Sequence, residues 1–221
     1  MLNNMKVLSS WSGGKDSCFA LMKSIKQGLK PTVLLNMMNE NGKVSRSHGI
    51  PFSVLEQQAK QIGVPLVAVP ASWNEYEKNF ITILHEIKKQ YEIDGVVFGD
   101  IDLESHKEWE EKVCNATKLK AFLPLWQQDR MELVFQMIDS GIETMIVSCN
   151  LEMGESYLGK IVTKELALEL QQKGIDACGE NGEYHTLVIN CPLFKEKISL
   201  PKYETKTYEK YCFIVWEEEN N

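Results

Sequence analysis

The sequence predicts an α/β protein, with a parallel sheet in its first half and a smaller α+β region in its second half. Two observations predict this fold class. Over the first 100 residues, short apolar segments alternate with segments whose apolar residues recur at helical spacing. The apolar segments are unbroken, which is typical of parallel strands that helices cover on both faces.

The first half contains four expected strands and three expected helices. The helix that follows the first strand repeats Phe19, Met22 and Ile25 at helical spacing and stops at Gly28. In an open parallel sheet, ligands bind at the carboxyl ends of the strands, so we expect the functional residues there. The expected strands are 5–11, 32–38, 65–70 and 95–100, and the expected helices are 15–28, 52–63 and 75–91.

After residue 125 the pattern of the sequence changes. Two further helices are expected at 128–140 and 163–173. Apolar segments at 143–150, 185–194 and 205–219 predict strands. We therefore predict two domains, at 1–125 and 126–221, although no stretch rich in proline, glycine or serine marks the boundary.

The composition limits the class of protein. The 221 residues include 24 basic and 31 acidic residues, a net charge of −7, and no basic run exceeds two lysines. A protein that binds nucleic acid in bulk through a basic surface is therefore not expected. The six cysteines form no C-x-x-C pair, which is typical of reduced cytosolic proteins. No apolar run reaches the roughly 18 residues that span a membrane, so we expect a cytoplasmic protein without a membrane partner.

A glycine-rich turn with the sequence SGGKDS, residues 12–17, joins the first strand to the first helix. It is not a Walker A loop, which would need glycine at position 9 and serine or threonine at position 16, where this chain has Ser9 and Asp16. It is not the dinucleotide motif G-x-G-x-x-G either, because Gly13 and Gly14 are adjacent. The turn therefore belongs to neither of these two classes of nucleotide loop.

The turn nevertheless has the chemistry of a phosphate site. Backbone N–H groups and the helix dipole face such a turn, and its two glycines let the backbone approach an anion closely. Ser12 and Ser17 supply hydroxyl groups, and Lys15 supplies a positive charge. Asp16 would repel a phosphate unless a cation lies between them, so we expect Mg²⁺ at Asp16. The alternative is an ordinary turn in which Asp16 or Ser17 caps the helix.

Further motifs connect the chain with a known family. The SGGKDS turn resembles the pyrophosphate loop of the N-type ATP pyrophosphatases. This turn and five other motifs occur in the order and spacing of the diphthine–ammonia ligase family. The chain is therefore similar to that family over nearly its whole length. These motifs are SHGIP at 47–51, GVVFGDI at 95–101, HKEWEEKVC at 106–114, LPLW at 123–126 and GENGEYHTLV at 179–188. The resemblance implies a Rossmann-like, HUP-type nucleotide-binding domain that uses ATP and Mg²⁺.

The resemblance also implies a reaction. The family converts the carboxylate of diphthine, a modified histidine of elongation factor 2, to an amide with ATP and ammonium. The carboxylate would become an adenylate with release of pyrophosphate, and ammonia would then displace AMP. The implied partners are elongation factor 2 carrying diphthine, or another carboxylate acceptor, and ammonium, and a homodimer is left open. RNA thiolation and a non-catalytic ATP-binding role remain the alternatives.

The family motifs supply candidate residues on the nucleotide side of the site. His48 and Gly99 are expected to lie against ATP, unless His48 is an ordinary surface histidine. Lys15 and Asp16 are expected to take part in catalysis. Asp100 closes the fourth strand and is also expected to be catalytic, and the alternative is that it only caps the helix that follows.

Other candidates are expected on the acceptor side. His106, Trp109 and Glu110 share one helix face with Val113, and they are expected to line the cleft between the domains. In GENGEYHT, Glu183 or His185 would remove the proton from ammonium. The alternative for this motif is a hairpin turn with a polar rim. The trimethylammonium group of diphthine would lie against the aromatic ring of Trp109, Trp126 or Tyr184, aided by the carboxylate of Glu180.

Overall fold

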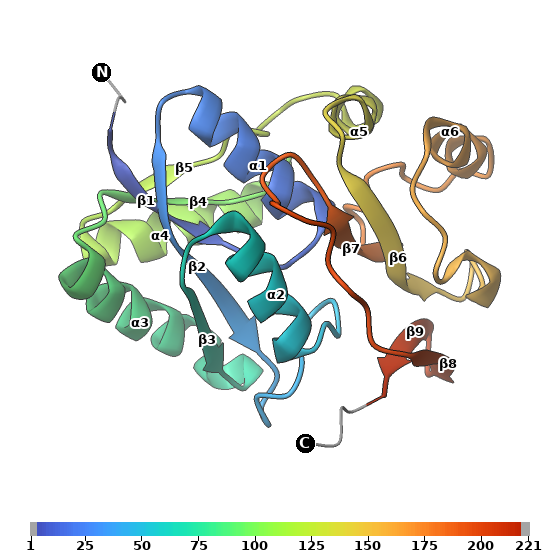
Figure 1. The fold of residues 1–221 in the computed structure, drawn as a ribbon, viewed down its shortest axis with the longest axis horizontal. Coiled ribbons are helices and arrows are strands. Elements are labelled where there is room, and N and C mark those ends of the chain that lie inside the picture. Colours follow the sequence, from blue (N-terminus) through green and yellow to red (C-terminus); the bar gives the residue numbers. More distant parts are fainter. Residues whose placement is uncertain (1–3, 218–221) are drawn as a thin grey trace.

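The computed structural model describes residues 4–217, which fold around two sheets (Figure 1). The first sheet has five strands in the order β3-β2-β1-β4-β5, and every neighbouring pair is parallel. The strands are β1 (Lys6–Ser10), β2 (Lys30–Met38), β3 (Leu66–Pro70), β4 (Gly95–Val97) and β5 (Lys120–Phe122). The carboxyl ends of all five strands therefore meet at one edge of this sheet.

Helices cover both faces of the first sheet. Successive side chains of a strand point to opposite faces, and in β1 the side chains of Val7 and Leu8 lie in two different hydrophobic clusters. The Val7 cluster includes residues of α1 (Lys15–Lys26) and α2 (Phe52–Ile62). The Leu8 cluster includes residues of α3 (Tyr76–Tyr91) and α4 (Glu104–Thr117). This arrangement explains why the strands are apolar without interruption.

The second sheet is antiparallel and has the strand order β7-β6-β9-β8. Its strands are β6 (Glu143–Asn150), β7 (Tyr184–Asn190), β8 (Tyr203–Tyr208) and β9 (Tyr211–Trp216). Two helices, α5 (Arg130–Asp139) and α6 (Lys164–Gln172), precede and follow β6. Short 3₁₀ helices occur at Trp73–Glu75 and Glu155–Tyr157.

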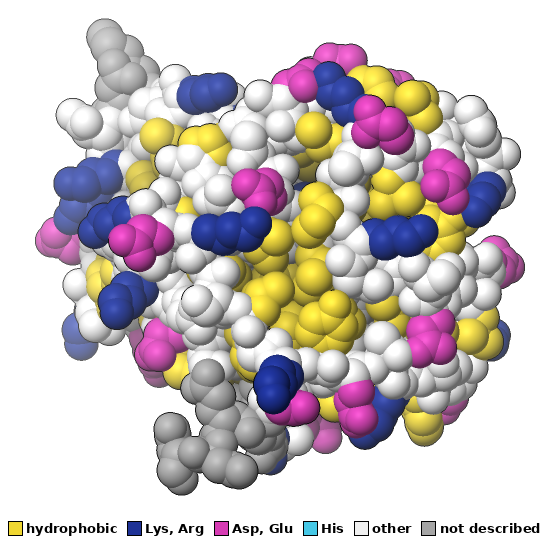
Figure 2. All heavy atoms as spheres, turned by 45° about the vertical axis from the view of Figure 1, so that its right-hand side comes forward, with side chains coloured by type: hydrophobic (Ala, Val, Ile, Leu, Met, Phe, Trp, Pro, Cys, Tyr) yellow, Lys and Arg dark blue, Asp and Glu magenta, His cyan; other side chains and the backbone are white. Residues whose placement is uncertain are grey.

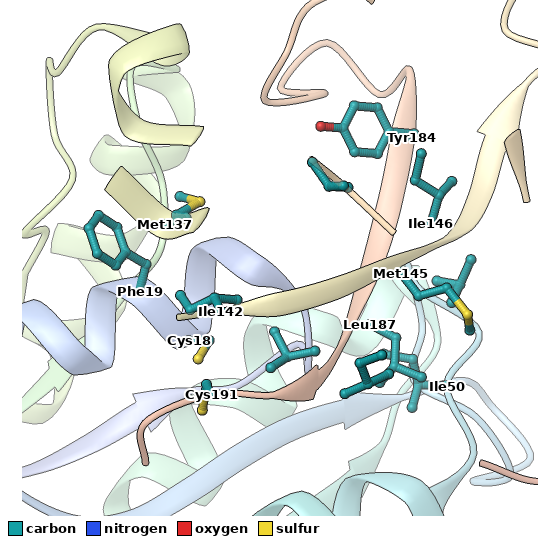
Figure 3. Close-up of a cluster of buried hydrophobic side chains, with 14 of the residues drawn as sticks. Cys18, Phe19, Ile50, Met137, Ile142, Met145, Ile146, Tyr184, Leu187 and Cys191 are labelled. Carbon is teal, nitrogen blue, oxygen red and sulfur yellow. The ribbon is translucent and has the colours of Figure 1, made fainter. Parts of the chain in front are cut away.

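One hydrophobic cluster joins the two halves of the chain. Phe19 of α1 lies near Met137 of α5, and Cys18 of α1 lies beside Cys191, which follows β7 (Figure 3). All six cysteines are free and buried. On the surface, basic and acidic side chains are interspersed around a central group of hydrophobic side chains on the face drawn in Figure 2. No helix within residues 4–217 is long and apolar enough to cross a membrane.

The predicted fold class is confirmed, with local differences. Strand β5 was not expected, because its three residues are too few to form an apolar run. The segment 205–219 is not one strand, because Glu209 adopts a φ of 52° in a turn between β8 and β9. Residues 218 and 219 of that segment lie outside the described residues. The strand expected at 185–194 ends at Asn190. The domain boundary near residue 125 remains a prediction.

Candidate active site

A cavity of about 630 Å³ lies at the carboxyl ends of β1, β2 and β4. Its volume is in the range of small-molecule sites. The first half of the chain contributes Ser10 of β1, Met37 of β2 and Phe98, which follows β4. The second half contributes residues on either side of the start of β7. The cavity therefore lies where both halves meet, at the edge of the sheet where the sequence predicts a ligand.

The two glycines of the SGGKDS turn are needed for packing. A Cβ atom at Gly13, whose φ is +85°, would lie 2.9 Å from the side chains of Ile50 and Leu55. A Cβ atom at Gly14 would lie 2.6 Å from the ring of His48. Neither glycine lines the cavity. Both glycines thus have a packing role, in which they let the turn pass under neighbouring side chains, and their contact with a phosphate remains a prediction.

The serines of the turn line the cavity and are linked to each other. The Oγ atoms of Ser12 and Ser17 are 3.1 Å apart, and Ser17 Oγ also donates to the carbonyl of Gly14. The N-cap of α1 is Gly14, which has no side-chain cap. The alternative that Asp16 or Ser17 caps this helix is therefore wrong.

Lys15 and Asp16 form a partly buried ion pair in the cavity. Lys15 Nζ lies 2.8 Å from Asp16 Oδ2 and donates to the carbonyl of Cys178 at 2.5 Å, and Lys15 is only 3% exposed. Burial alone would lower the pKa of Lys15, but the charge of Asp16 raises this pKa above its ordinary value, so Lys15 stays charged. Lys15 Nζ also lies 5.2 Å from the ring centre of Tyr184. The lysine charge is therefore already partly neutralised.

Asp16 also bears on the expected Mg²⁺ site. Its Oδ1 atom is buried and has no hydrogen-bond partner in the part of the chain that the structure describes. No group of three or more His, Cys, Asp or Glu side chains within the described residues is arranged to hold a metal ion. Mg²⁺ commonly takes only one or two carboxylate ligands and completes its shell with water and phosphate oxygens. Asp16 can therefore supply the single carboxylate ligand that such an ion needs from the protein.

Strand β7 supports the turn, which the sequence did not predict. The backbone N–H of Lys15 donates to Thr186 Oγ1 at 3.1 Å, and the N–H of Val188 donates to the carbonyl of Gly13 at 2.9 Å. Gln58, fully buried in α2, donates from Nε2 to the same Gly13 carbonyl at 3.1 Å. The first helical N–H groups have no partner inside a helix, so Thr186 satisfies one of them.

His48 and His185 form a pair of neutral rings in the cavity. Their ring centres are 4.7 Å apart, and His48 Nδ1 lies 2.8 Å from the carbonyl oxygen of Thr186. Burial lowers the pKa of His48 to about 4. Burial, with the nearby His48 and Lys15, lowers the pKa of His185 to about 3. Both rings are therefore uncharged near neutral pH, and His48 is not an ordinary surface histidine.

Asp100, which also lines the cavity, links His106 to Glu110. His106 Nδ1 lies 2.7 Å from Asp100 Oδ1. Burial opposes ionisation of Asp100, but hydrogen bonds from His106 and Glu110 hold its pKa below the usual range. Burial and the hydrogen bond to Asp100 raise the pKa of Glu110, which is 2% exposed, to about 11. Asp100 does not cap α4, whose N-cap is Leu103.

Gly99 brings this group close to the turn. A Cβ atom at Gly99 would lie 2.8 Å from the backbone nitrogen of Ser17 and 2.9 Å from the carbonyl carbon of Asp16. Only glycine allows such a close approach of two backbones. Gly99 thus places the neighbouring Asp100 on the same side of the cavity as the start of α1.

Comparisons with known proteins identify the family. The model of the diphthamide synthase N-terminal domain matches residues 5–121, and the model of the diphthamide synthase C-terminal domain matches residues 129–220. The chain belongs to the diphthamide synthase family. The resemblance inferred from the sequence motifs is confirmed.

Relatives of this diphthamide synthase family member carry the name diphthine–ammonia ligase. The Danio rerio protein is 29% identical over 235 residues, which cover 95% of this chain and 91% of that protein. The Rattus norvegicus protein is 29% identical, with 95% and 88% covered. The Schizosaccharomyces pombe protein is 32% identical over 95% of this chain but only 39% of its own length.

One solved structure shows a weaker likeness to the chain. It is described as the predicted subunit of a tRNA methyltransferase from Methanocaldococcus jannaschii, and it is 17% identical to this chain. The match has a TM-score of 0.45 and covers 88% of this chain and 100% of the other. A likeness at this level carries no argument about function.

Not all residues predicted for the acceptor side lie in the cavity of this diphthamide synthase family member. His106, Trp109, Glu110, Glu180, Tyr184 and His185 line it. Trp126 does not line the cavity, and its ring instead receives the ammonium group of Lys107 at 5.3 Å. Glu183 does not line it either, because its carboxylate accepts hydrogen bonds from Asn181 in the adjacent turn.

Tyr184 and Trp109 differ in what their rings contact. Tyr184 is 2% exposed, its hydroxyl donates to the carbonyl of Ala177, and its ring already faces Lys15. Trp109 is half-buried among aromatic side chains, 5.6 Å from Tyr76 and 5.0 Å from Phe80 between ring centres. Of the three aromatic residues predicted to hold a cationic group, Trp109 is therefore the one whose placement suits that role.

Proposed function

We propose that this chain is an ATP-dependent ligase that converts a carboxylate into an amide with ammonia. The acceptor that fits best is the diphthine side chain of elongation factor 2. Membership of the diphthamide synthase family and relatives named diphthine–ammonia ligase support the proposal. The observation that carries the proposal is that one cavity holds both the SGGKDS turn and Asp100 with its partners His106 and Glu110. The turn and Asp100 lie at the ends of the neighbouring strands β1 and β4.

In this proposal ATP is a substrate whose phosphates lie at the start of α1. Ser12 and Ser17 offer hydroxyl donors, and the helix N-terminus and Lys15 offer positive potential. Asp16 would hold Mg²⁺ through Oδ1, and the bound ion would neutralise charge on the phosphates. The acceptor carboxylate would attack the phosphate of the AMP moiety, so that pyrophosphate leaves and an acyl-adenylate remains.

The second half of the reaction needs a proton acceptor. Attack by ammonia on the acyl-adenylate forms a C–N bond, breaks the C–O bond to AMP and releases one proton. His185 is a poor proton acceptor because its pKa is lowered to about 3, and Glu183 does not line the cavity. We propose His106 as the proton acceptor, because Asp100 orients its ring and favours its protonated form.

The acceptor side of the cavity suits a cationic group. Trp109 offers an aromatic face, and Glu180 offers a carboxyl group close by. Burial and the charge of Asp16 raise the pKa of Glu180 to about 8, and a bound cation would shift this pKa down again. If the trimethylammonium group of diphthine lies between Trp109 and Glu180, the carboxylate of diphthine stays free to react.

The test is a labelling experiment with the complete chain. Elongation factor 2 that carries diphthine is incubated with the protein, ATP, Mg²⁺ and isotopically labelled ammonium, and the factor is analysed by mass spectrometry. The proposal expects label in the modified histidine, together with equal amounts of AMP and pyrophosphate. Release of pyrophosphate without labelling of the factor would indicate another acceptor. If the protein binds ATP but releases no pyrophosphate with any acceptor, it has a non-catalytic role.

A further inference from the structure

Arg46 is a cation in the cavity with unused hydrogen-bond donors. It lines the cavity, and its Nε and Nη2 atoms are buried and have no hydrogen-bond partner among the described residues. It forms no ion pair with any residue from 4 to 217. The chain has two arginines, and the other one, Arg130, bonds Asp102 through Nε and Nη2 and Asp176 through Nη1. The contrast shows that Arg46 lacks the partner that a buried guanidinium normally has.

The two free nitrogens of Arg46 define the shape of the missing ligand. The Nε and Nη2 hydrogens lie along one edge of the planar guanidinium and point in parallel. This edge matches two oxygen atoms of a single phosphate or carboxylate group. Because both nitrogens are free together, the site suits one oxyanion bound by two hydrogen bonds.

The position of Arg46 is fixed by the loop that follows β2. The backbone N–H of Arg46 donates to the carbonyl of Met37 at 3.1 Å, and Ser45 forms an isolated bridge with Met38. The indole of Trp73 packs on the guanidinium, with its ring centre 4.8 Å from the central carbon of Arg46. Such stacking holds the plane of the guanidinium without using its N–H groups. The free edge is therefore preorganised.

The loop of Arg46 faces the SGGKDS turn. His48, two residues after Arg46, lies against Gly14 of the turn. A Cβ atom at Gly14 would be 2.6 Å from the ring of His48. The charge of Lys15 contributes to lowering the pKa of His48, so the lysine is also nearby. Lys15 itself is paired with Asp16. A polyphosphate at the turn would thus meet Arg46 in the same cavity, as a cation without an acidic partner among residues 4–217.

We propose that Arg46 is a binding residue for the polyphosphate chain of ATP, which it holds by a two-pronged hydrogen bond. This inference rests on the proposed use of ATP and adds a second wall to its site. It assigns Arg46 to the nucleotide and not to the carboxylate of the acceptor.

The test measures nucleotide binding by isothermal titration calorimetry with Mg²⁺ present. ATP and adenosine are titrated into the parent protein and into the R46Q, R46K and K43Q variants. R46Q is expected to weaken ATP binding by about 10- to 100-fold, the effect of losing hydrogen bonds to a charged group, and to leave adenosine binding unchanged. R46K keeps the charge without the fork and should lie between R46Q and the parent. K43Q removes a positive charge from the same loop outside the cavity lining and should bind ATP like the parent.

Three results would overturn the inference. R46Q could bind ATP as tightly as the parent while its circular dichroism and melting temperature match those of the parent. R46Q could instead raise the KM for the acceptor without changing ATP affinity, which would assign Arg46 to the acceptor carboxylate. Finally, a parent protein that binds no ATP would overturn the proposed function as well, and this is visible before any variant is made.

Discussion

The hydroxyl oxygen of Thr186 accepts a hydrogen bond from the backbone N–H of Lys15, 171 residues earlier in the chain. Strand β7 of the second sheet thereby stabilises the first turn of α1. Thr186 is 1% exposed, so this N–H has no access to water as a substitute partner.

Replacing Thr186 by valine tests this link. Valine keeps the shape of threonine but leaves the Lys15 N–H buried without an acceptor, which should lower the free energy of unfolding by about 1–3 kcal/mol. Urea unfolding measures the change, and Thr186→Ser, which keeps the oxygen, should stay close to the parent. Equal stabilities of the valine and serine variants would show that the hydrogen bond does not matter.

The rate of amide formation should depend on the ionisation of His106. Asp100 raises the pKa of His106, and only the neutral ring accepts a proton, so the rate should increase as the pH rises through this raised pKa. Asp100→Asn removes the charge that favours the imidazolium, so the rise should move to lower pH. His106→Asn should slow amide formation by about 100-fold and abolish this rise.

A partial reaction and a second histidine provide the controls for His106. Exchange of labelled pyrophosphate into ATP, measured with the acceptor present, reports the adenylation step alone and should be kept by His106→Asn. Because ammonium itself titrates, the pH series is repeated with hydroxylamine as the nucleophile. His185→Asn should retain the same rise in rate with pH. A loss of the rise in that variant would assign the proton transfer to His185 instead.

Glu110 should make the protein less stable as the pH rises. The folded carboxyl keeps its proton up to about pH 11, whereas an unfolded glutamate loses it near about pH 4.3. Between these values the folded state binds more protons, so the free energy of unfolding falls with increasing pH. Glu110→Gln cannot ionise, and its stability relative to the parent should therefore increase from about pH 5 to 8 in urea unfolding. A constant difference over this range would mean that Glu110 is charged in the folded protein.

The two tryptophans of the predicted acceptor group should differ in effect. Trp109→Ala removes an aromatic face from the cavity and should raise the KM for a trimethylammonium-bearing acceptor by about tenfold, with a smaller change in kcat. Trp126→Ala makes the same chemical change outside the cavity and should leave this KM unchanged. Steady-state kinetics with both variants, with melting temperatures as a check on folding, decides between these roles. An equal rise of KM in both variants would contradict the placement.

Much of the fold was predictable from the sequence because periodicity reports local structure. Unbroken apolar segments identified β1 to β4, and the helical spacing of Phe19, Met22 and Ile25 identified α1. Strand β5 was not predictable, since a three-residue strand is formed by pairing with β4 and not by its own pattern. The turn at Glu209 carries no glycine or proline that would have marked it.

The candidate site was predictable only in part, for a related reason. Motifs located the residues of the turn and Asp100, but not what surrounds them. Thr186 and Gln58 contribute through hydrogen bonds to residues 171 and 45 positions away, which no local pattern records. Arg46 directly precedes the SHGIP motif, and its one signal was an arginine in a loop after a strand. Glu183 and Trp126 belong to motifs but do not line the cavity, because membership of a motif does not fix the direction of a side chain.

The stacking of Trp73 on Arg46 gives the loop an intrinsic optical reporter. Trp73 is 68% exposed, and its indole touches the guanidinium that would meet the nucleotide. Trp11, in contrast, is buried at 1% exposure, with its indole N–H bonded to Gln58 at 2.8 Å. The described chain holds three further tryptophans, Trp109, Trp126 and Trp216, so a Trp73→Phe variant identifies the part of an emission change that arises at the loop. Ligand arrival at this wall of the cavity can thus be followed in real time without attaching a dye to the protein.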